Sequence, residues 1–553
     1  MKVLIKNTKI ENFSKIYKKL VRPILSGLFL LASGGLYAGA ASAQATNIYI
    51  TPDGGGSGVC TNNTHPPSWF NNSGNWGNGG TQIGPGTVVH LCGSFTDSTA
   101  NDTLLSFQGS GTPGHPVTLL FESGTTLTNS NYWSDNNGAI WSNGNTNITV
   151  DGGANGLIQN TGNGSARANK HDTKGLVISN CSANCVIKNL HVDNLYVHIP
   201  GTSASQQGED GPGPNGIATG MACDACSNFT IGPGNEAHDD FVGIEFNWLN
   251  SSATNGEIYG NTVSRNNWGI LAAGVKGGIN GLKIHDNDIS DAFPWDDWQD
   301  GNHHNGIFVF EVGAGSTISN LQQYNNYIHG DMGDICTGGL NHATAFIFND
   351  YNGGTWVAPL LFNNVLVNTN PNCGPANGML TVISNSGSGG IYNNTFTGRG
   401  AAINLNGTFL IKNNIFTKTD LGITNLNGTI GASDYNLFFG LTGANQAPGA
   451  VMVDHNSSIK FFSNVAQWMT SSGFDSHASI ANPNLTGNFQ LGSGSGAAGG
   501  TNLSSLGIAA LNVDRAGSPR PSSGSWDRGA YSAGGATSNN APNPPTNLTV
   551  IVQ

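Results

Sequence analysis

Short stretches in which apolar and polar residues alternate recur along the chain from residue 176 onward. One set carries a polar residue, usually asparagine, at a bend, as in "GEIYGNTVSRN" and "GLKIHDNDISD". A second set is often led by glycine, as in "VGIEFN", "WGILAAG" and "NGIFVFE". Alternation with a period of two is typical of a β-strand that buries one face. The pattern therefore predicts an all-β chain with two strands in each repeat.

The asparagines at the bends give the period of the repeat. They recur at intervals of 26, 39, 38, 30 and 20 residues, at Asn261, Asn287, Asn326, Asn364, Asn394 and Asn414. Self-similarity at this period indicates a solenoid, and two strands per repeat with almost no helix-forming segment favour a parallel β-helix. Asparagines at equivalent bends can form a hydrogen-bonded ladder along the axis. We therefore assign these asparagines a structural role and no catalysis.

Other segments resemble those of a known family. The opening "NIYITPDGGGSG", the segment "IGPGTVVHLCGSF", the "NN" bends and the closing "DRAGSPRPSSGSWDRGAY" are similar to the secreted right-handed parallel β-helix proteins of the pectate-lyase-like superfamily. The resemblance covers most of residues 46–533 and implies an all-β, right-handed parallel β-helix (solenoid) with an N-terminal cap. The family contains lyases, hydrolases, epimerases and non-catalytic surface proteins, so the fold does not decide the reaction.

The two ends of the chain have distinct compositions. Residues 1–43 carry seven basic residues, then the apolar run "ILSGLFLLASGGLYAGA", then the small-residue cleavage site "ASA", which is typical of a secretory signal peptide. A membrane anchor is the alternative, but glycines interrupt the apolar run. We therefore predict a chain that is secreted or held at the cell surface, with no membrane insertion after signal cleavage. Residues 534–553 read as a Gly/Ser/Asn/Pro-rich tail that resembles a linker.

Charge excludes two classes of partner. The whole chain has 21 Lys+Arg and 33 Asp+Glu, and removal of residues 1–43 takes away seven basic residues and Glu11. The mature chain then has 14 basic against 32 acidic residues, a formal net charge of −18. With no basic stripe to neutralise phosphates, nucleic acid and anionic membranes are excluded as partners. The expected partner is a polysaccharide, bound by a monomer.

Eight cysteines in an exported chain favour disulfide bonds. The sequence favours two disulfide pairings, Cys60 with Cys92 and Cys336 with Cys373. The connectivity of the middle four stays open between local and cross-coil pairing: Cys181, Cys185, Cys223 and Cys226. Cys185 and Cys226 precede strands that read as equivalent, so we expect them to stack about 4.8 Å apart, which suits a disulfide. A four-thiolate zinc site is the alternative, which an oxidising compartment disfavours.

Insertions between the two strands of a coil mark where a site can form. They fall on the same side of the repeat, at residues 194–215, 232–240, 290–305, 329–343 and 368–377. In a stacked solenoid such insertions project from one edge, and loops on a rigid scaffold often carry function. We therefore predict one wall of loops, rich in carboxylates and histidines, that lines the deepest groove.

The segment "HDDFVGIEF" at 238–246 provides the leading catalytic hypothesis. Asp239 or Asp240 is expected to act with Asp300, because their loops precede equivalent strands two coils apart, which separates the carboxyls by about 9.6 Å and favours an inverting mechanism. Adjacent residues at a strand entrance point to opposite sides, so only one of the two aspartates can face the groove. His303 or His304 is expected to hold the proton of the acid.

Residues expected to bind substrate surround that pair. Trp295 and Trp298 offer flat apolar platforms for sugar rings, and Glu245, which should point away from the apolar interior, is expected to face solvent or the groove. Glu311 and Arg265 complete the set of candidate substrate-binding residues.

The sequence does not decide whether the protein binds a metal ion. Clustered carboxylates can hold calcium, which the resembling family often uses, but no regular calcium-loop motif is present. The histidines can ligate zinc, although adjacent histidines do not readily place both rings on one ion and no H-x-x-x-H occurs.

Three functions fit these residues. The first is a glycoside hydrolase that degrades a polysaccharide with paired carboxylates. The second is a polysaccharide lyase, which needs a base and positive charge and here would need calcium, because Arg265, Lys276 and Lys170 are the only basic residues nearby. The third is a non-catalytic glycan-binding or adhesive protein, which the Asn/Gly/Ser/Thr-rich surface favours. The sequence alone does not name the glycan.

Overall fold

The computed structural model describes residues 46–56, 58–162, 171–195, 218–246, 252–275, 277–291, 304–313, 315–331, 343–350, 353–372, 374–375, 377–426, 428–443, 449–455 and 458–533. The signal peptide predicted at 1–43 and the tail predicted at 534–553 lie outside these residues. No helix in the described part of the chain is long and apolar enough to cross a membrane.

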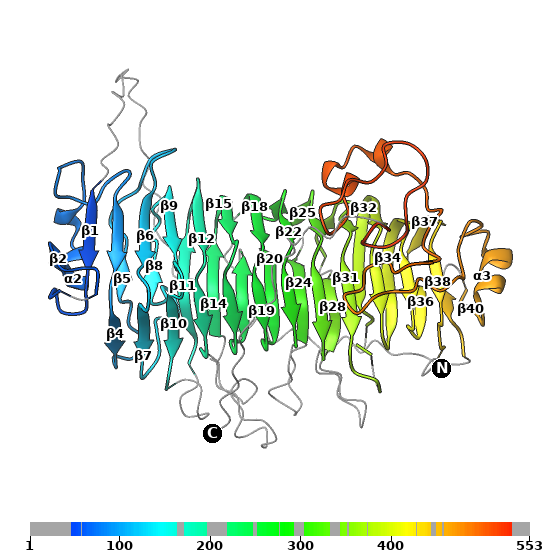
Figure 1. Cartoon of the computed structure of the whole chain (residues 1–553), viewed down its shortest axis with the longest axis horizontal. Helices are drawn as coiled ribbons and strands as arrows, with labels where there is room; N and C mark the ends of the chain where they lie inside the picture. The colour runs from blue at the N-terminus through cyan, green and yellow to red at the C-terminus, as the bar shows by residue number, and fades with distance from the viewer. Residues whose placement is uncertain are drawn as a thin grey trace.

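The chain forms a right-handed parallel β-helix, as predicted. Strands stack side by side along the long axis of the molecule (Figure 1), and successive coils pair in parallel register. A representative coil consists of β17 (Val242–Phe246), β18 (Ala253–Tyr259) and β19 (Thr262–Ser264), after which β20 (Trp268–Val275) pairs with β17. The prediction of two strands per repeat is therefore wrong, because the bend at Asn261 divides one predicted strand into β18 and β19.

Two extended parallel sheets contain most of the strands. The sheet that we call the short-strand sheet has 12 strands in the described residues: β4 (Ser94–Asp97), β7 (Thr126–Asn129), β10 (Leu157–Asn160), β13 (His191–Asp193), β16 (Glu236–His238), β19, β23 (Asp288–Ser290), β27 (Tyr327–Gly330), β31 (Val365–Asn368), β33 (Thr395–Thr397), β35 (Ile415–Thr417) and β38 (Leu437–Phe439).

The other large sheet joins the remaining two sides of the coils. Its long strands follow the corner after the short-strand sheet: β11 (Thr173–Ser179), β14 (Ala218–Asp224), β17, β20, β24 (His304–Val312), β28 (Ala343–Asp350), β32 (Leu380–Tyr392), β34 (Ala401–Lys412), β36 (Leu421–Asn425) and β39 (Met452–Asp454). Its other strands are β1 (Asn47–Ile50), β2 (Thr64–His65), β3 (Val88–Leu91), β6 (Val117–Phe121), β9 (Ile148–Asp151), β12 (Cys185–Lys188), β15 (Ser227–Ile231), β18, β21 (Ile279–Asn280), β22 (Lys283–His285), β25 (Thr317–Ser319), β26 (Gln322–Tyr324), β29 (Thr355–Trp356), β30 (Leu360–Phe362), β37 (Thr429–Asp434) and β40 (Lys460–Phe462). A separate pair consists of β5 (Leu105–Ser106) and β8 (Ile140–Trp141).

The apolar residues of each strand form continuous columns inside the solenoid. Ile244, Ile270, Ile307 and Ile347 follow one another in register, and each is fully buried. Near the C-terminal end, Phe396, Phe416 and Phe438 stack with ring centroids about 5 Å apart. Burial of such columns from water is the main favourable term that holds the coils together.

The asparagine ladder predicted from the sequence is present. In each rung the side-chain amide donates to the side-chain oxygen of the asparagine in the next coil, as Asn326 does to Asn364 at 3.0 Å, and to a backbone carbonyl. The ladder contains the six predicted residues and extends to Asn235 and Asn436, whose amide donates to Asp475. All members are buried, so the ladder satisfies polar groups that water cannot reach.

The two ends of the solenoid are closed by different elements. At the N-terminal end lie the short helices α2 (Pro67–Phe70) and η1 (Ser73–Asn75), where Phe70 and Trp76 pack against Phe107. At the other end β40 pairs with β39 in antiparallel orientation, and α3 (Val465–Ser472) follows, with Trp468 buried. Figure 1 shows both groups at opposite ends of the stack.

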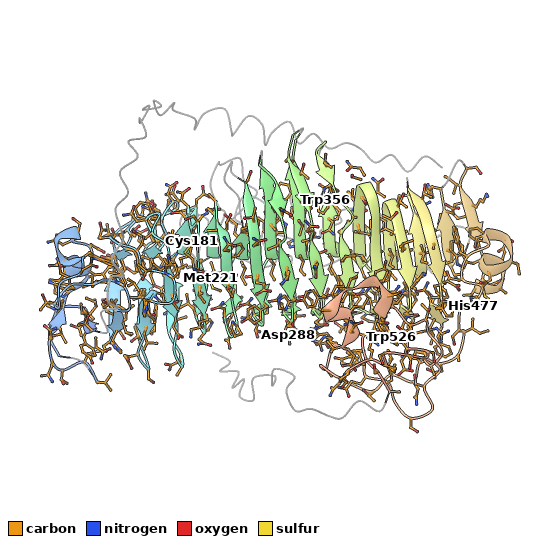
Figure 2. All side chains as sticks on the ribbon, turned by 90° about the horizontal axis from the view of Figure 1, so that it is seen from above. Cys181, Met221, Asp288, Trp356, His477 and Trp526 are labelled. Carbon is orange, nitrogen blue, oxygen red and sulfur yellow. A yellow bond between two sulfur atoms is a disulfide. The ribbon has the colours of Figure 1, made fainter. Side chains whose placement is uncertain are left out.

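The C-terminal segment, residues 480–533, lies against the outer faces of the later coils, beside the solenoid in Figure 2. It contains the short 3-10 helices η3 (Ser504–Leu506) and η4 (Ala509–Asn512). Trp526 packs with Tyr324, Phe362 and Tyr392, and the buried guanidinium of Arg520 donates to Asn363 at 2.9 Å. The segment therefore covers the outer face of the short-strand sheet in the later coils, from β31 to β38.

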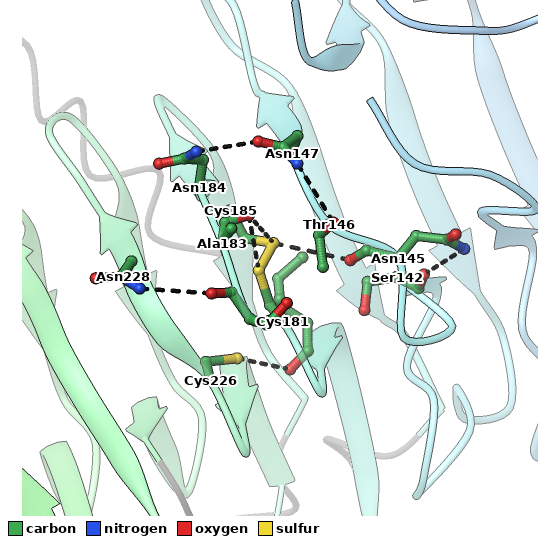
Figure 3. Close-up of a disulfide and its surroundings, with 12 residues drawn as sticks. Ser142, Asn145, Thr146, Asn147, Cys181, Ala183, Asn184, Cys185, Cys226 and Asn228 are labelled. Carbon is green, nitrogen blue, oxygen red and sulfur yellow. Dashed lines mark hydrogen bonds between the residues drawn. A yellow bond between two sulfur atoms is a disulfide. The ribbon is translucent and has the colours of Figure 1, made fainter. Parts of the chain in front are cut away.

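Two disulfides are present in the described residues, Cys60–Cys92, as predicted, and the local pair Cys181–Cys185 (Figure 3). Cys185 is in register with Phe229, three residues beyond Cys226, so the prediction that Cys185 and Cys226 stack is wrong. Cys223 and Cys226 are buried free thiols. Cys336 and Cys373 lie outside the described residues.

We expect the substitution Asn326→Ala to destabilise the solenoid. It removes four hydrogen bonds of one rung and leaves buried groups of neighbouring coils without partners, at about 1–3 kcal/mol for each unsatisfied group. Chemical denaturation followed by circular dichroism measures the loss. The control Asn372→Ala changes an exposed asparagine outside the ladder and should leave the transition in place. Equal stability of the two variants would contradict a structural role for the ladder.

Candidate functional site

The outer face of the short-strand sheet is unusually polar across five neighbouring strands, β13, β16, β19, β23 and β27. In each strand the central residue is buried, and its two neighbours point outward. We call this surface the polar face; its outward residues are His191, Asp193, Glu236, His238, Thr262, Ser264, Asp288, Ser290, Tyr327 and His329. Parallel register places these residues in two rows that run along the solenoid axis.

The C-terminal segment forms one boundary of the polar face. Tyr327 lies under the guanidinium of Arg515, 5.5 Å from the ring centroid, and packs on Phe489. Tyr327 also stacks on His329, whose Nε2 is 2.8 Å from Oδ1 of Asp288. Figure 2 places Asp288 on the same side of the solenoid as this segment. Aromatic stacking therefore fixes a histidine–carboxylate pair at this end of the polar face.

At the other end of the polar face, His191, Asp193, His238, Asp239 and Arg265 form what we call the histidine cluster. Nε2 of His191 and Nε2 of His238 are 2.7 Å apart, and Nδ1 of His238 is 2.6 Å from Oδ2 of Asp239. The Arg265 guanidinium donates from Nε to both oxygens of Asp239, from Nη2 to Oδ2, and lies 3.0 Å from Nδ1 of His238. Arg265 thus fixes Asp239, which in turn orients His238.

Burial and neighbouring charges separate the pKa values of the cluster. Burial opposes ionisation of Asp239, but hydrogen bonds from His238 and Arg265 outweigh it and lower its pKa to about 2. Burial, reinforced by the Asp239 charge, raises the pKa of Asp193 to about 6. Burial also lowers the pKa of His191 to about 4, and His238 adds to that effect. Around neutral pH the cluster therefore contains a firmly ionised carboxylate beside a neutral imidazole.

A backbone feature explains why Asp239 reaches these partners. Asn194, Asp239, Arg265 and Asp291 each follow a strand of the short-strand sheet and adopt positive φ angles of 51–57°. Asparagine and aspartate tolerate this left-handed conformation better than most residues do. The chain turns there, so the side chains of Asp239 and Arg265 meet across adjacent coils.

Asp240 has a different environment from Asp239. Its side chain is fully buried, its Oδ1 accepts the Leu195 N–H at 3.0 Å, and its own N–H donates to Asn266 at 2.8 Å. Burial raises the pKa of Asp240 well above its usual value. Asp240 is thus a structural residue of the corner, and the expectation that it can serve as a groove-facing catalytic residue conflicts with this burial. Asp239 is the one of the two aspartates that faces outward.

Glu245 is buried as well, so the expectation that it faces solvent or the groove is wrong. Lys174 donates to Glu245 at 3.1 Å and lies 3.4 Å from Asp224, while Thr219 donates to the other oxygen of Glu245. Burial raises the pKa of Glu245, with Lys174 opposing the shift. Burial opposes the charge of Lys174, but the carboxylates of Asp224 and Glu245 outweigh it and raise the pKa of Lys174. These groups form a buried ionic network on the long strands.

The other predicted residues fall partly outside the described structure. His304 begins β24 and is fully buried. Glu311 is part of β24, but its side chain lies outside the described residues, as do Asp300, His303, Trp295 and Trp298. The strands β17, β20 and β24 are successive neighbours, which confirms that the loops before β17 and β24 are two coils apart.

We predicted that the insertions project from one edge of the solenoid. For four of them, the points at which they leave and rejoin the sheets agree with this prediction. The segments 194–215, 290–305, 329–343 and 368–377 all leave the short-strand sheet and lead to a long strand. Most residues of the first three segments lie outside the described structure. The segment 232–240 is no insertion, because it contains the ladder residue Asn235 and strand β16.

Sequence reasoning missed His191 and Asp193 as site residues. Both lie in "HVD" of β13, which is in register with "EAH" of β16, so aligning the coils strand by strand would place them beside His238. Glu236 and Asp288 were also not assigned a role. They occupy the same row with Thr262 between them, which puts them two strand spacings, about 9.6 Å, apart.

Calcium does not fit the described residues well. Calcium takes six to eight oxygen ligands, whereas the group of metal-capable side chains found in the described part of the chain, His191, Asp193 and His238, offers two nitrogens and one carboxylate.

Comparisons with known proteins give distant structural likenesses only. No family model and no curated protein matches the sequence. Among solved structures, the pectate lyase Pel9A is 12% identical, with a TM-score of 0.41, over 89% of this chain and 98% of that one. An alginate lyase from Paenibacillus sp. is 12% identical, with a TM-score of 0.32, over 71% of this chain and 98% of that one. A family 28 exopolygalacturonase from Yersinia enterocolitica is 13% identical, with a TM-score of 0.32, over 65% and 70% of the two chains. None of these likenesses indicates the reaction.

We expect Asp240→Asn to fold and to be at least as stable as the wild type at neutral pH. The amide keeps an oxygen that accepts the Leu195 N–H and removes a carboxyl whose charge is costly to bury; Asn266 occupies the corresponding position in the next coil. The contrasting variant Asp240→Ala loses the acceptor and should be about 1–3 kcal/mol less stable. Thermal unfolding compares the three proteins, and a large loss in the Asn variant would show that the ionised carboxylate is needed.

Proposed function

We propose that the protein is a secreted carbohydrate-active enzyme, a glycoside hydrolase that cleaves a polysaccharide on the polar face of the short-strand sheet. The observation that carries the proposal is the pair of outward carboxylates Glu236 and Asp288, with Thr262 between them. Disulfides Cys60–Cys92 and Cys181–Cys185 fit an oxidising, extracytoplasmic compartment.

The spacing of the pair suits an inverting mechanism. Two carboxyl groups about 6.5–9.5 Å apart leave room for a water molecule opposite the leaving group, while a retaining enzyme needs about 5–5.5 Å. Glu236 and Asp288 are two strands apart, close to the upper end of the inverting range. One carboxyl group would protonate the glycosidic oxygen, and the other would activate the water. This arrangement has the same two-coil separation as the one expected for Asp239 and Asp300, but uses Glu236 and Asp288 of the short-strand sheet.

Other features support this face as the place of catalysis. The carboxylate of Glu236 is exposed and has no hydrogen-bond partner among the described residues, so it is free to meet a substrate. The carboxylate of Asp288 is 44% exposed and is oriented by His329. The polar rows run along the solenoid axis, which suits an extended chain of sugars rather than a small ligand.

A polysaccharide lyase and a non-catalytic binding protein are the competing functions. A lyase generates an unsaturated sugar that absorbs ultraviolet light, whereas a hydrolase generates reducing ends without that absorbance. A binding protein retains glycan and releases neither product. A panel of polysaccharides assayed for both signals, with a pull-down on insoluble glycans, therefore separates the three functions.

We expect Glu236→Gln and Asp288→Asn each to lower turnover by about a hundredfold or more, as loss of a general acid or base does. The matched control is Glu257→Gln, which removes a partly exposed carboxylate on β18 that pairs with Lys283, outside the short-strand sheet. Proton NMR of the first-formed anomer should show inversion, and azide should restore activity only to the variant that lacks the base. Full turnover in both site variants would exclude this pair.

A further inference from the structure

Three atoms of the histidine cluster converge on one point. Nε2 of His191, Nε2 of His238 and Oδ2 of Asp193 form a triangle with sides of 2.7, 3.7 and 4.0 Å. The radius of the circle through three points is the product of the sides divided by four times the area. Here it is about 2.1 Å, within the roughly 2.0–2.2 Å that zinc keeps from imidazole nitrogen and carboxylate oxygen. A single ion can therefore lie at bonding distance from all three atoms with little movement of the side chains.

The surroundings of His238 have the arrangement typical of a metal ligand. A metal-binding histidine usually donates its other ring N–H to a carboxylate, which fixes the tautomer and the ring orientation. Nδ1 of His238 is 2.6 Å from Asp239, so a proton on Nδ1 leaves the Nε2 lone pair directed toward His191 and Asp193. Arg265 holds Asp239 in place from the next coil. Asp239, which orients the proposed ligand His238, is thus itself held in place by hydrogen bonds.

A hydrogen bond between the two imidazoles is the competing explanation for the short contact. One proton shared between the Nε2 atoms accounts for 2.7 Å, but it gives Asp193 no partner. Oδ2 of Asp193 is 3.7 Å or more from both histidines, and its buried Oδ1 has no hydrogen-bond partner among the described residues. A carboxylate directed toward two imidazole nitrogens without a donor is an arrangement that a cation stabilises.

We propose that His191, Asp193 and His238 bind one divalent transition-metal ion of the zinc class. Two imidazoles and one carboxylate are too nitrogen-rich for calcium or magnesium, and three protein ligands leave a coordination position open to water or substrate. Glu236 is in register with His191, so the three ligands lie beside one of the two proposed catalytic carboxyl groups. Metal binding goes beyond the proposed hydrolysis and is testable without any substrate.

The test uses the full mature chain, stripped with a chelator and dialysed. Titration with Zn²⁺, followed by calorimetry and by elemental analysis of the loaded protein, should give one tightly held ion per chain and a higher Tm. Titration with Co²⁺ should give visible absorption bands typical of nitrogen and oxygen ligands. Strong thiolate charge-transfer absorption would instead assign the ion to cysteine ligands and would overturn the proposal.

Variants identify the ligands. His191→Ala, Asp193→Asn and His238→Ala should each weaken binding severely, while Asp239→Asn, which only loosens the orientation of His238, should weaken it about 10–100-fold. The matched control is His477→Ala, because His477 pairs with Asp434 at 2.8 Å in an exposed site without a second histidine. Its affinity should equal that of the wild type. Circular dichroism of each metal-free variant verifies folding, and His238→Gln replaces any alanine variant that unfolds.

Two further results would also overturn the inference. One is a wild-type protein that takes up no stoichiometric Zn²⁺ or Co²⁺. The other is tight binding that survives the loss of both His191 and His238. Neither result bears on hydrolysis by Glu236 and Asp288, because release of reducing sugar is assayed separately. If the protein binds no metal at this site but still releases reducing sugar, the metal site is excluded and the proposed hydrolysis is retained.

Discussion

The parallel stacking of one coil on the next is the constraint on which the rest of the structure depends. Each rung of the asparagine ladder binds the backbone of one coil and the side chain of the next, so a bend can only lie directly beside its predecessor. The ladder fixes the corner before each short strand. Once these corners coincide, residues that follow them at equal distance also coincide, and every outward side chain joins a row along the axis.

The candidate site follows from that registration. The ladder residues Asn235 and Asn261 are 26 residues apart, and the same offset separates Asp239 from Arg265 and Asp240 from Asn266. The ion pair between Arg265 and Asp239, which orients His238, therefore depends on the length of the coil as well as on the identity of the two residues. An insertion or deletion of one residue between these coils would separate Arg265 from Asp239 even though both side chains remained.

The fold could be predicted from the sequence because two local patterns repeat many times along it. These are the alternation of apolar and polar residues in the strands and the asparagine at each bend. The site was harder to read. In "HDD" the decision between Asp239 and Asp240 rests on a left-handed backbone at Asp239 and on the Leu195 N–H of the preceding coil, neither of which the triplet contains. Glu245 was misplaced for a similar reason, since its partner Lys174 is 71 residues earlier in the chain. His191 and Asp193 gave no motif, because their partner His238 is supplied by the next coil.

The reversal of strand direction at the C-terminal end has a consequence for how the chain behaves in a crowded solution. A stack of parallel strands ends in a row of unpaired backbone amides and carbonyls, which would accept a strand from another molecule and extend the sheet. Here the last partner, β40, runs antiparallel to β39, and α3 with its buried Trp468 follows directly. A second solenoid that approached this end would meet a strand of the wrong polarity and a helix. The cap therefore protects the protein against end-to-end growth into fibres, a hazard for any chain built as a one-dimensional stack.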